Sequence, residues 1–382
     1  MIMRFKMEHY LDNSATTKVC PEAAEAALKA MTETFGNPSS THTLGRNAKK
    51  LLESSRKKVA AALGCLPEEL VFTSCGSESD NWALLRGAEA MRRKGSHIIS
   101  SAVEHDAVRK SLDLLEQAGF SVTRLSPDAT GAIPAESVRN ALRDDTILVS
   151  LMMVNNETGA LTDISAISRM LKSAGSGALL HTDAVQAFTK IPFSAKTLGA
   201  DMISISGHKI HAPKGIGALY IRKGLHLKPL IVGGGQEDGR RAGTEPLPQI
   251  AAFAEAAAIA YARREEAIAH MQALKQSAIA QLTAAIPELT YLDTPAPHIL
   301  SISLPGWRSE VLMNLLEAHQ VYVSKSSACK KGGRSHVLEA IGLKSDVIDG
   351  ALRIGISRYN TGEDIAALVS GLTEARNTLA HR

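Results

Sequence analysis

The chain alternates between short runs of aliphatic and β-branched residues and longer segments with helical periodicity. The strand-like runs lie at residues 70–73, 97–100, 146–154, 177–180, 202–205 and 216–221. Helical patterns lie between the earlier runs, at about residues 44–63, 79–91 and 107–118. Strands separated by helices are typical of a mostly parallel sheet covered by helices. We therefore predict an α/β fold.

The pattern changes after the glycine-rich residues 233–235. Residues 251–282 are rich in alanine and predict one or two long helices. Two strands and two helices are expected beyond them, at residues 299–302, 310–318, 321–323 and 364–379. A chain of 382 residues is long enough for two domains. We expect a large domain over residues 15–260 and a smaller α/β domain formed by residues 1–14 and 261–382.

The composition excludes several classes of protein. Hydrophobic residues make up 45% and charged residues 21%, which predicts a folded body rather than a disordered or membrane-embedded chain. The 43 basic and 39 acidic residues are spread along the sequence, so nucleic-acid binding is not expected. The 4 cysteines form no CxxC pair and indicate neither a disulfide framework nor a cysteine-rich zinc site. Because no secretory signal and no run of about 20 apolar residues is evident, we expect a cytoplasmic protein that does not bind membranes.

The segment Ser-Gly-His-Lys at residues 206–209 follows the apolar run 201–205. In an α/β sheet, ligands bind at the carboxyl ends of strands, and a lysine amine placed there can form a Schiff base. An isolated lysine is more often a solvated surface charge. The function of Lys209 therefore depends on its neighbours.

Asp183 is one such neighbour, because it ends another strand-like run 26 positions before Lys209 (209 − 183) and is followed by Gln186. Pyridoxal phosphate requires a lysine for its aldehyde and a carboxylate for its ring nitrogen, which makes the ring an electron sink. Asp183 and Lys209 meet both needs if their strand ends are adjacent. Taken alone, Asp183 is equally well explained as the N-cap of a helix.

A phosphate site is indicated by residues 73–81, which join a strand to a helix and include Ser77. Backbone N–H groups and the helix dipole at such a start bind anions, and a serine hydroxyl adds a donor. Ser206 and His208 are placed to supply further contacts beside the lysine. The alternative is that the serines of this loop only cap the helix.

A metal site is the other interpretation of this region, since His208 and His211 form an HxxH pair. Two histidines at this spacing converge on a metal only within a helix, whereas Gly207 and Pro213 indicate a loop. We therefore expect no metal site.

Short motifs along nearly the whole chain resemble those of the NifS/IscS-like cysteine desulfurases, in the order of that family. They lie at residues 10–17, 35–40, 77–81, 104–105, 154–159, 183–186, 206–209, 241–244 and 327–329. These enzymes are class V members of the fold type I pyridoxal phosphate enzymes. The resemblance implies that fold, with a large mostly parallel sheet domain and a smaller domain that carries the loop of a catalytic cysteine.

The resemblance implies four contacts with the pyridoxal ring. Lys209 would hold the cofactor covalently, and Asp183 would pair with the ring nitrogen. Gln186 would bind the ring hydroxyl. His105 would stack on the ring and assist proton transfer.

Further implied contacts bind the phosphate and the substrate. The phosphate would be held by Gly76, Ser77, Ser206, His208 and, from a second subunit, Thr244. A homodimer is therefore expected. Asn156 would contact the cofactor and, with Arg353, fix the carboxylate of L-cysteine, for which an arginine fork is well suited.

Cys329 would be the nucleophile that receives the sulfur of L-cysteine as a persulfide, leaving L-alanine. The thiolate is the reactive form, and an ordinary thiol has a pKa of about 8.5, so a basic surrounding would favour attack. Basic residues nearby in the sequence are Lys325, Lys330, Lys331 and Arg334. They are otherwise explained as solvated loop charges, and Cys329 as an inert cysteine.

The predicted activity is that of a cysteine desulfurase that supplies sulfur to an acceptor protein for iron–sulfur cluster assembly or tRNA thiolation. The alternatives are a selenocysteine lyase, another class V aminotransferase, or a sulfur-carrier partner without turnover. Two departures from the family concern Ser77, where threonine is usual, and residues 324–329, Ser-Lys-Ser-Ser-Ala-Cys, which lack the usual glycine. The sequence does not identify the acceptor.

Overall fold

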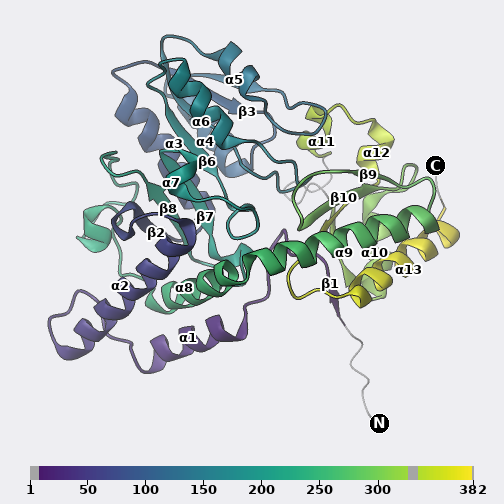
Figure 1. The fold of residues 1–382 in the computed structure, drawn as a ribbon, viewed down its shortest axis with the longest axis horizontal. Helices are drawn as coiled ribbons and strands as arrows, with labels where there is room; N and C mark the ends of the chain where they lie inside the picture. The colour runs from purple at the N-terminus through teal and green to yellow at the C-terminus, as the bar shows by residue number, and fades with distance from the viewer. Residues whose placement is uncertain (1–7, 326–333, 381–382) are drawn as a thin grey trace.

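The computed structural model describes residues 8–325 and 334–380, which form two lobes (Figure 1). The larger lobe is built on a seven-stranded sheet with the order β2-β8-β7-β6-β5-β3-β4. Its strands are β2 (Leu70–Thr73), β3 (His97–Ser101), β4 (Ser121–Leu125), β5 (Thr146–Ser150), β6 (Leu179–Asp183), β7 (Met202–Ser206) and β8 (Gly217–Ile221). Among the described strands of this sheet, β8 pairs antiparallel with β2 and with β7, and all other pairings are parallel. The predicted mostly parallel α/β sheet is confirmed.

Helices cover both faces of this sheet. They are α1 (Pro21–Thr32), α2 (Thr43–Leu63), α3 (Gly76–Met91), α4 (Asp106–Gln117), α5 (Ala135–Ala141), α6 (Ile164–Ser173), α7 (Ala195–Leu198) and α8 (Leu247–Ala262). Successive strand residues point to opposite faces. Accordingly, Ile98 packs in the core beneath α3 and α4, and Ile99 packs in the core shared with α2, α6 and α8.

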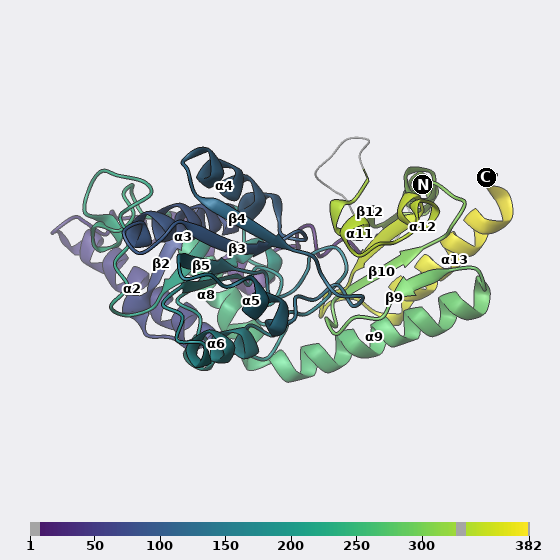
Figure 2. The same ribbon diagram turned by 90° about the horizontal axis from the view of Figure 1, so that it is seen from above.

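The smaller lobe contains a four-stranded antiparallel sheet with the order β12-β13-β10-β9. Its elements are β9 (Thr290–Leu292), β10 (Ile299–Ser303), β12 (Ser324–Lys325), β13 (Ala351–Gly355), α9 (Arg264–Ala285), α10 (Ser309–Ala318), α11 (His336–Ala340), α12 (Ser345–Asp349) and α13 (Gly362–Thr378). A second hydrophobic core lies between this sheet and helices α9, α10 and α13. Helix α9 runs along this lobe in both views (Figures 1 and 2).

The N-terminal segment belongs to the smaller lobe by its contacts. Strand β1 (His9–Tyr10) pairs in parallel with β11 (Val321–Tyr322), and Asp12 forms a bridge with Gly355 at the end of β13. The next residues then pass to the larger lobe, where Thr17 donates its backbone N–H to the carbonyl of His208. This crossing brings the two lobes together beside the loop that contains Lys209.

The bounds of two predicted helical regions differ from the observed ones. The alanine-rich region is two helices, α8 and α9, broken at Arg263, whose φ of −107° and ψ of 19° are not helical. Helix α3 begins at Gly76, three residues before its predicted start (79 − 76), because its first turn is polar and lacks the apolar spacing used for the prediction.

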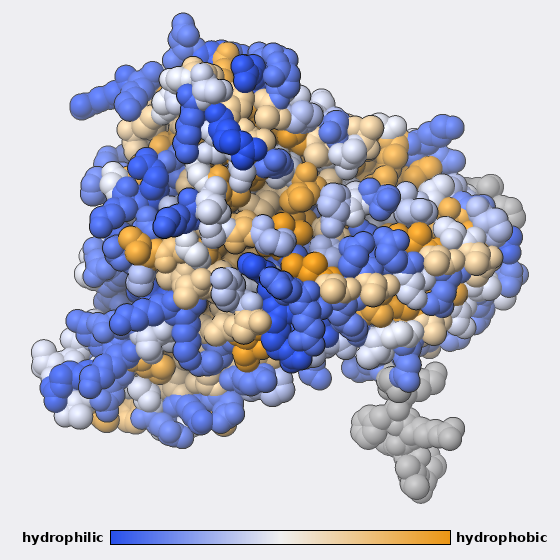
Figure 3. Space-filling view, viewed as in Figure 1, coloured by the Kyte–Doolittle hydropathy of each residue, from blue (hydrophilic) through white to orange (hydrophobic). Residues whose placement is uncertain are grey.

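The described residues contain no helix that is long and apolar enough to cross a membrane. On the face shown in Figure 3, hydrophilic and hydrophobic residues are interspersed.

Candidate active site

A cavity of about 360 Å³ lies at the carboxyl ends of β6 and β7, where the two lobes meet. The predicted site residues that line it are Gly76, Ser77, His105, Asn156, Asp183, Gln186, Ser206, His208, Lys209 and Arg353. The other two predicted site residues are Thr244 and Cys329. Thr244 is exposed to solvent and does not line this cavity, and Cys329 lies outside the described residues. A larger cavity of about 870 Å³ beside α6 and α7 contains none of these side chains.

Lys209 enters the cavity from the short helix η2 (Gly207–Lys209), directly after β7. Its Nζ donates hydrogen bonds of 2.6 Å to the backbone carbonyls of Ser14 and Ala15. Both carbonyls lie in the segment that crosses from the smaller lobe. The position of the amine therefore depends on contact between the lobes.

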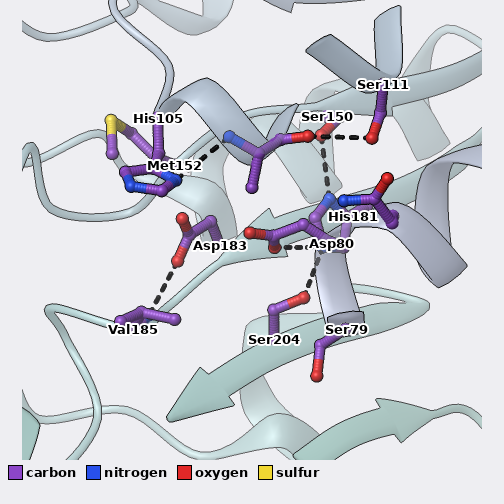
Figure 4. A network of polar contacts seen from close by, with 12 residues as sticks. Ser79, Asp80, His105, Ser111, Ser150, Met152, His181, Asp183, Val185 and Ser204 are labelled. Atoms are coloured by element: carbon purple, nitrogen blue, oxygen red, sulfur yellow. Dashed lines mark hydrogen bonds and ion pairs between the residues drawn. The ribbon is translucent and has the colours of Figure 1, made fainter. Parts of the chain in front are cut away.

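Asp183 is the last residue of β6 and pairs in register with Ser204 of the adjacent strand β7. The carboxylate of Asp183 accepts a hydrogen bond of 2.8 Å from the backbone N–H of Val185 and points between Val185 and His105 (Figure 4). Burial raises the pKa of Asp183, while the charges of His105 and Lys209 act to lower it. The site therefore favours a cationic partner for this carboxylate, such as a protonated ring nitrogen.

Asp80 is a residue of this site that the sequence analysis missed. It lies one layer deeper, with its Oδ1 3.6 Å from Nε2 of His181 (Figure 4). Burial and the charge of Asp183 raise the pKa of Asp80 well above its ordinary value, so the negative charge of one carboxyl group disfavours ionisation of the other. Burial lowers the pKa of His181 to about 3, so that ring is neutral. Asp80 lies in a recognised motif, but only the tertiary fold buries it beside a second carboxyl group.

His105 stands at the N-terminus of α4, and its Nδ1 accepts a hydrogen bond of 3.1 Å from the N–H of Ala107. The ring thus caps the helix and faces the cavity at the same time (Figure 4). The preceding Glu104 is 1% exposed and accepts hydrogen bonds from Ser101 and from the backbone N–H of Met152. These bonds fix the turn from which the imidazole of His105 projects.

The carboxyl group of Glu104 makes a testable contribution to stability, because burial raises its pKa to about 8. An unfolded glutamate has a pKa of about 4.3, so between these values the folded protein holds a proton that the unfolded chain releases. The free energy of unfolding must then fall as the pH rises through this range. We expect the free energy of unfolding of the wild-type protein to fall by about 4 kcal/mol more than that of Glu104→Gln between about pH 5 and 8, measured by urea unfolding.

The control for Glu104→Gln is Glu136→Gln, which changes a carboxylate whose side chain is 69% exposed. This control should follow the pH dependence of the wild-type protein. If Glu104→Gln also did so, Glu104 would not be a buried proton-binding group.

The turn from β2 into α3 has the features of a phosphate cradle. Among the described residues, the N-cap residue of α3, Cys75, makes no side-chain capping hydrogen bond. A Cβ atom at Gly76 would lie 2.7 Å from a methyl group of Val185, so only glycine fits this wall. The buried hydroxyl of Ser206 has no hydrogen-bond partner within the part of the chain that the structure describes. N–H groups of a first helical turn and an unsatisfied hydroxyl suit an anion with several acceptor oxygens.

His208 contributes no positive charge to this cradle. Burial, with the charge of Lys209, lowers the pKa of His208 to about 3. Its Nδ1 lies 3.2 Å from the hydroxyl of Thr16. A phosphate contact from this residue would therefore be a neutral hydrogen bond.

Arg353 projects from β13 of the smaller lobe and is 2% exposed. Its guanidinium group donates to the carbonyl of Asn156 at 3.0 Å and to the carboxylate of Asp12 at 3.2 Å. Its Nε has no hydrogen-bond partner among residues 8–325 and 334–380. A buried arginine with an unsatisfied N–H beside a cavity is suited to bind a ligand carboxylate.

Of the four basic residues predicted to surround Cys329, the structure describes only the first and the last. Lys325 lies 3.3 Å from the carboxylate of Glu310, and Arg334 pairs with Asp349 at 2.8 Å. Both cations are therefore held in partly exposed ion pairs, while Lys330 and Lys331 lie outside the described residues. Ser335 donates a hydrogen bond to Glu157, which lines the cavity and was not predicted.

Comparisons with known proteins identify the family. The family model for aminotransferase class-V matches residues 9–368. The cysteine desulfurase IscS of Methanosarcina thermophila is 43% identical over 370 residues, which cover 96% of this chain and 91% of that protein. The chain belongs to the cysteine desulfurases of the class-V aminotransferase family.

Solved structures agree with this assignment. A NifS-like protein superimposes with a TM-score of 0.92 at 38% identity, over 98% of this chain and 100% of that one. SspA, solved in complex with cysteine, gives a TM-score of 0.80 at 32% identity, over 93% of this chain and 100% of SspA. The predicted fold and the predicted family are therefore both confirmed.

Proposed function

We propose that this cysteine desulfurase binds pyridoxal phosphate in the 360 Å³ cavity and transfers sulfur from L-cysteine to Cys329, releasing L-alanine. The observation that carries the proposal is the placement of Lys209 and Asp183 at the ends of adjacent strands, on the walls of one cavity. A lysine amine and a buried carboxylate are the two groups that this cofactor requires. Full-length cysteine desulfurases among the relatives support the same activity.

The residues present fit the cofactor. Lys209 would hold its aldehyde, Asp183 its ring nitrogen and Gln186 its ring hydroxyl. Gly76, Ser77, Ser206 and His208 would hold the phosphate, and the hydroxyl of Ser206, which has no partner among the described residues, supports this. When bound, the cofactor supplies an electron sink for the electrons left at the substrate Cα.

The protein side chains would then orient the substrate and move its protons. Arg353 and Asn156 would fix the substrate carboxylate. Lys209, with His105 beside it, would carry the proton removed from the substrate Cα. The thiolate of Cys329 would take the substrate sulfur as a persulfide.

We also propose the organisation in which this chemistry occurs. Residues 15–260 would form the cofactor-binding domain and residues 1–14 and 261–382 the smaller domain, which the separate hydrophobic cores support. Because Thr244 is exposed and away from the cavity of its own chain, its predicted phosphate contact requires a homodimer. The expected setting is the cytoplasm, with an iron–sulfur scaffold or a tRNA-thiolation protein as the sulfur acceptor.

The test is to incubate the purified protein with L-cysteine, pyridoxal phosphate and a thiol reductant and to measure both products. We expect sulfide and alanine in equal amounts. An aminotransferase would form a keto acid instead, and a selenocysteine lyase would favour selenocysteine over cysteine. A protein that stays colourless with pyridoxal phosphate and forms neither product would contradict the proposal and favour a sulfur-carrier partner.

A further inference from the structure

A strained segment lies along the edge of the large sheet, between the glycines at 233–235 and Thr244. Glu237 has a φ of 49° and Asp238 a φ of 56°, so two successive residues other than glycine are in the left-handed region. Such a conformation persists only where surrounding contacts hold it. Glu237 itself is buried, with its side chain 2% exposed.

The contacts that hold Glu237 are ionic and directional. Arg56 of α2 donates from both terminal nitrogens to the two carboxylate oxygens of Glu237, at 2.7 and 2.6 Å. Arg56 also lies over the ring of Phe72, 4.8 Å from its centroid, and donates to the carbonyl of Leu70. A bidentate arginine–carboxylate pair fixes orientation as well as position.

Glu237 also completes the edge of the sheet. Strand β2 is an edge strand, and the backbone N–H of Phe72 donates to the carboxylate of Glu237 at 3.0 Å. The side chain thus occupies a position that a further strand would otherwise take. We refer to Arg56, Glu237 and the N–H of Phe72 as the edge lock.

The edge lock lies directly before residues that the proposed phosphate site uses. Arg241, four positions after Glu237 (241 − 237), donates to Glu78 in the first turn of α3 at 3.0 and 3.3 Å. Glu78 in turn accepts the backbone N–H of Ser74. Thr244 follows three positions later (244 − 241) on the exposed end of the same segment.

We propose that Glu237 is a positioning residue for cofactor binding: the edge lock fixes the segment 236–244, so that Arg241 holds the phosphate-binding turn and Thr244 is presented to a second copy of this chain. The inference rests on the proposed function, because it assigns phosphate binding to that turn. Neither Glu237 nor Arg56 lines the cavity, so both act through other residues.

The test measures the dissociation constant for pyridoxal phosphate of the apo-protein by absorbance titration, together with the thermal midpoint. We expect Glu237→Gln to weaken binding about tenfold, the effect of losing one hydrogen bond to a charged group. The matched control is Glu255→Gln, which breaks the exposed pair of Glu255 with Lys58 and leaves the edge lock intact. This control should bind as the wild-type protein does.

A double variant separates positioning from stability. Glu237→Gln leaves the guanidinium of Arg56 buried without its partner, which destabilises a protein more than removing both charges. Arg56→Met combined with Glu237→Gln should therefore regain part of the thermal midpoint yet still bind the cofactor about tenfold more weakly. If affinity recovers with the midpoint, or if Glu237→Gln binds normally, the proposal is wrong. If the wild-type protein does not bind pyridoxal phosphate, the proposed function fails instead.

Discussion

Replacing Lys209 by alanine is expected to lower desulfurase turnover by about 1,000-fold or more. One side chain would lose two tasks, the covalent attachment of the cofactor and the transfer of the substrate Cα proton, and proton transfer alone contributes about 100- to 10,000-fold. Cofactor binding would persist through the phosphate contacts and Asp183. The measurements are the rate of alanine formation and mass spectrometry after borohydride reduction, which should no longer show cofactor attached to the protein.

The control for this variant is Lys214→Ala, five positions further along the chain (214 − 209) and exposed to solvent. It should retain turnover and borohydride-stable attachment. The Lys209→Ala protein loses the hydrogen bonds of the amine to the carbonyls of Ser14 and Ala15, so its thermal unfolding is measured as well, and it should still unfold cooperatively. Turnover near the wild-type rate would remove Lys209 from its proposed role.

The sequence was sufficient to predict the sheet and most of the cavity because the two are physically linked. Strand-like runs ending at residues 183 and 205 mark where parallel strands stop, and parallel strands that are neighbours bring those ends together. Short motifs then supplied side chains at these ends. The break at Arg263 was not predictable in the same way, because the α8–α9 region contains neither glycine nor an internal proline at that point.

The roles of Asp80 and Glu237 could not be predicted from the sequence pattern. A polar residue near the start of a helix, or an acidic residue in a glycine-rich loop, is ordinarily solvated. The pKa of Asp80 is raised because α3 buries it beside Asp183 of β6, and Glu237 becomes structural because β2 is an edge strand beside Arg56. Both roles arise from contacts between segments distant in sequence, for which local periodicity carries no signal.

Replacing Cys329 by serine is expected to reduce sulfur transfer by about 1,000-fold or more, because a hydroxyl group cannot accept sulfur as a persulfide. The cavity would be unchanged, so the visible absorbance of the bound cofactor and its change on adding L-cysteine should remain. The measurement is alanine and sulfide formation with a thiol reductant, combined with mass spectrometry of the protein after brief exposure to L-cysteine. The wild-type protein should gain the mass of one sulfur atom at Cys329.

The control thiol is Cys65, which lines the remote larger cavity. Burial raises the pKa of Cys65 to about 12, so its thiol is protonated near neutral pH and cannot act as a nucleophile. Cys65→Ser should therefore keep full activity and the added sulfur. If Cys329→Ser still formed alanine at the wild-type rate, sulfur would leave the substrate without a protein thiol, as expected of a selenocysteine lyase or another class V enzyme. Loss of product with an intact cofactor signal identifies Cys329 as the sulfur carrier.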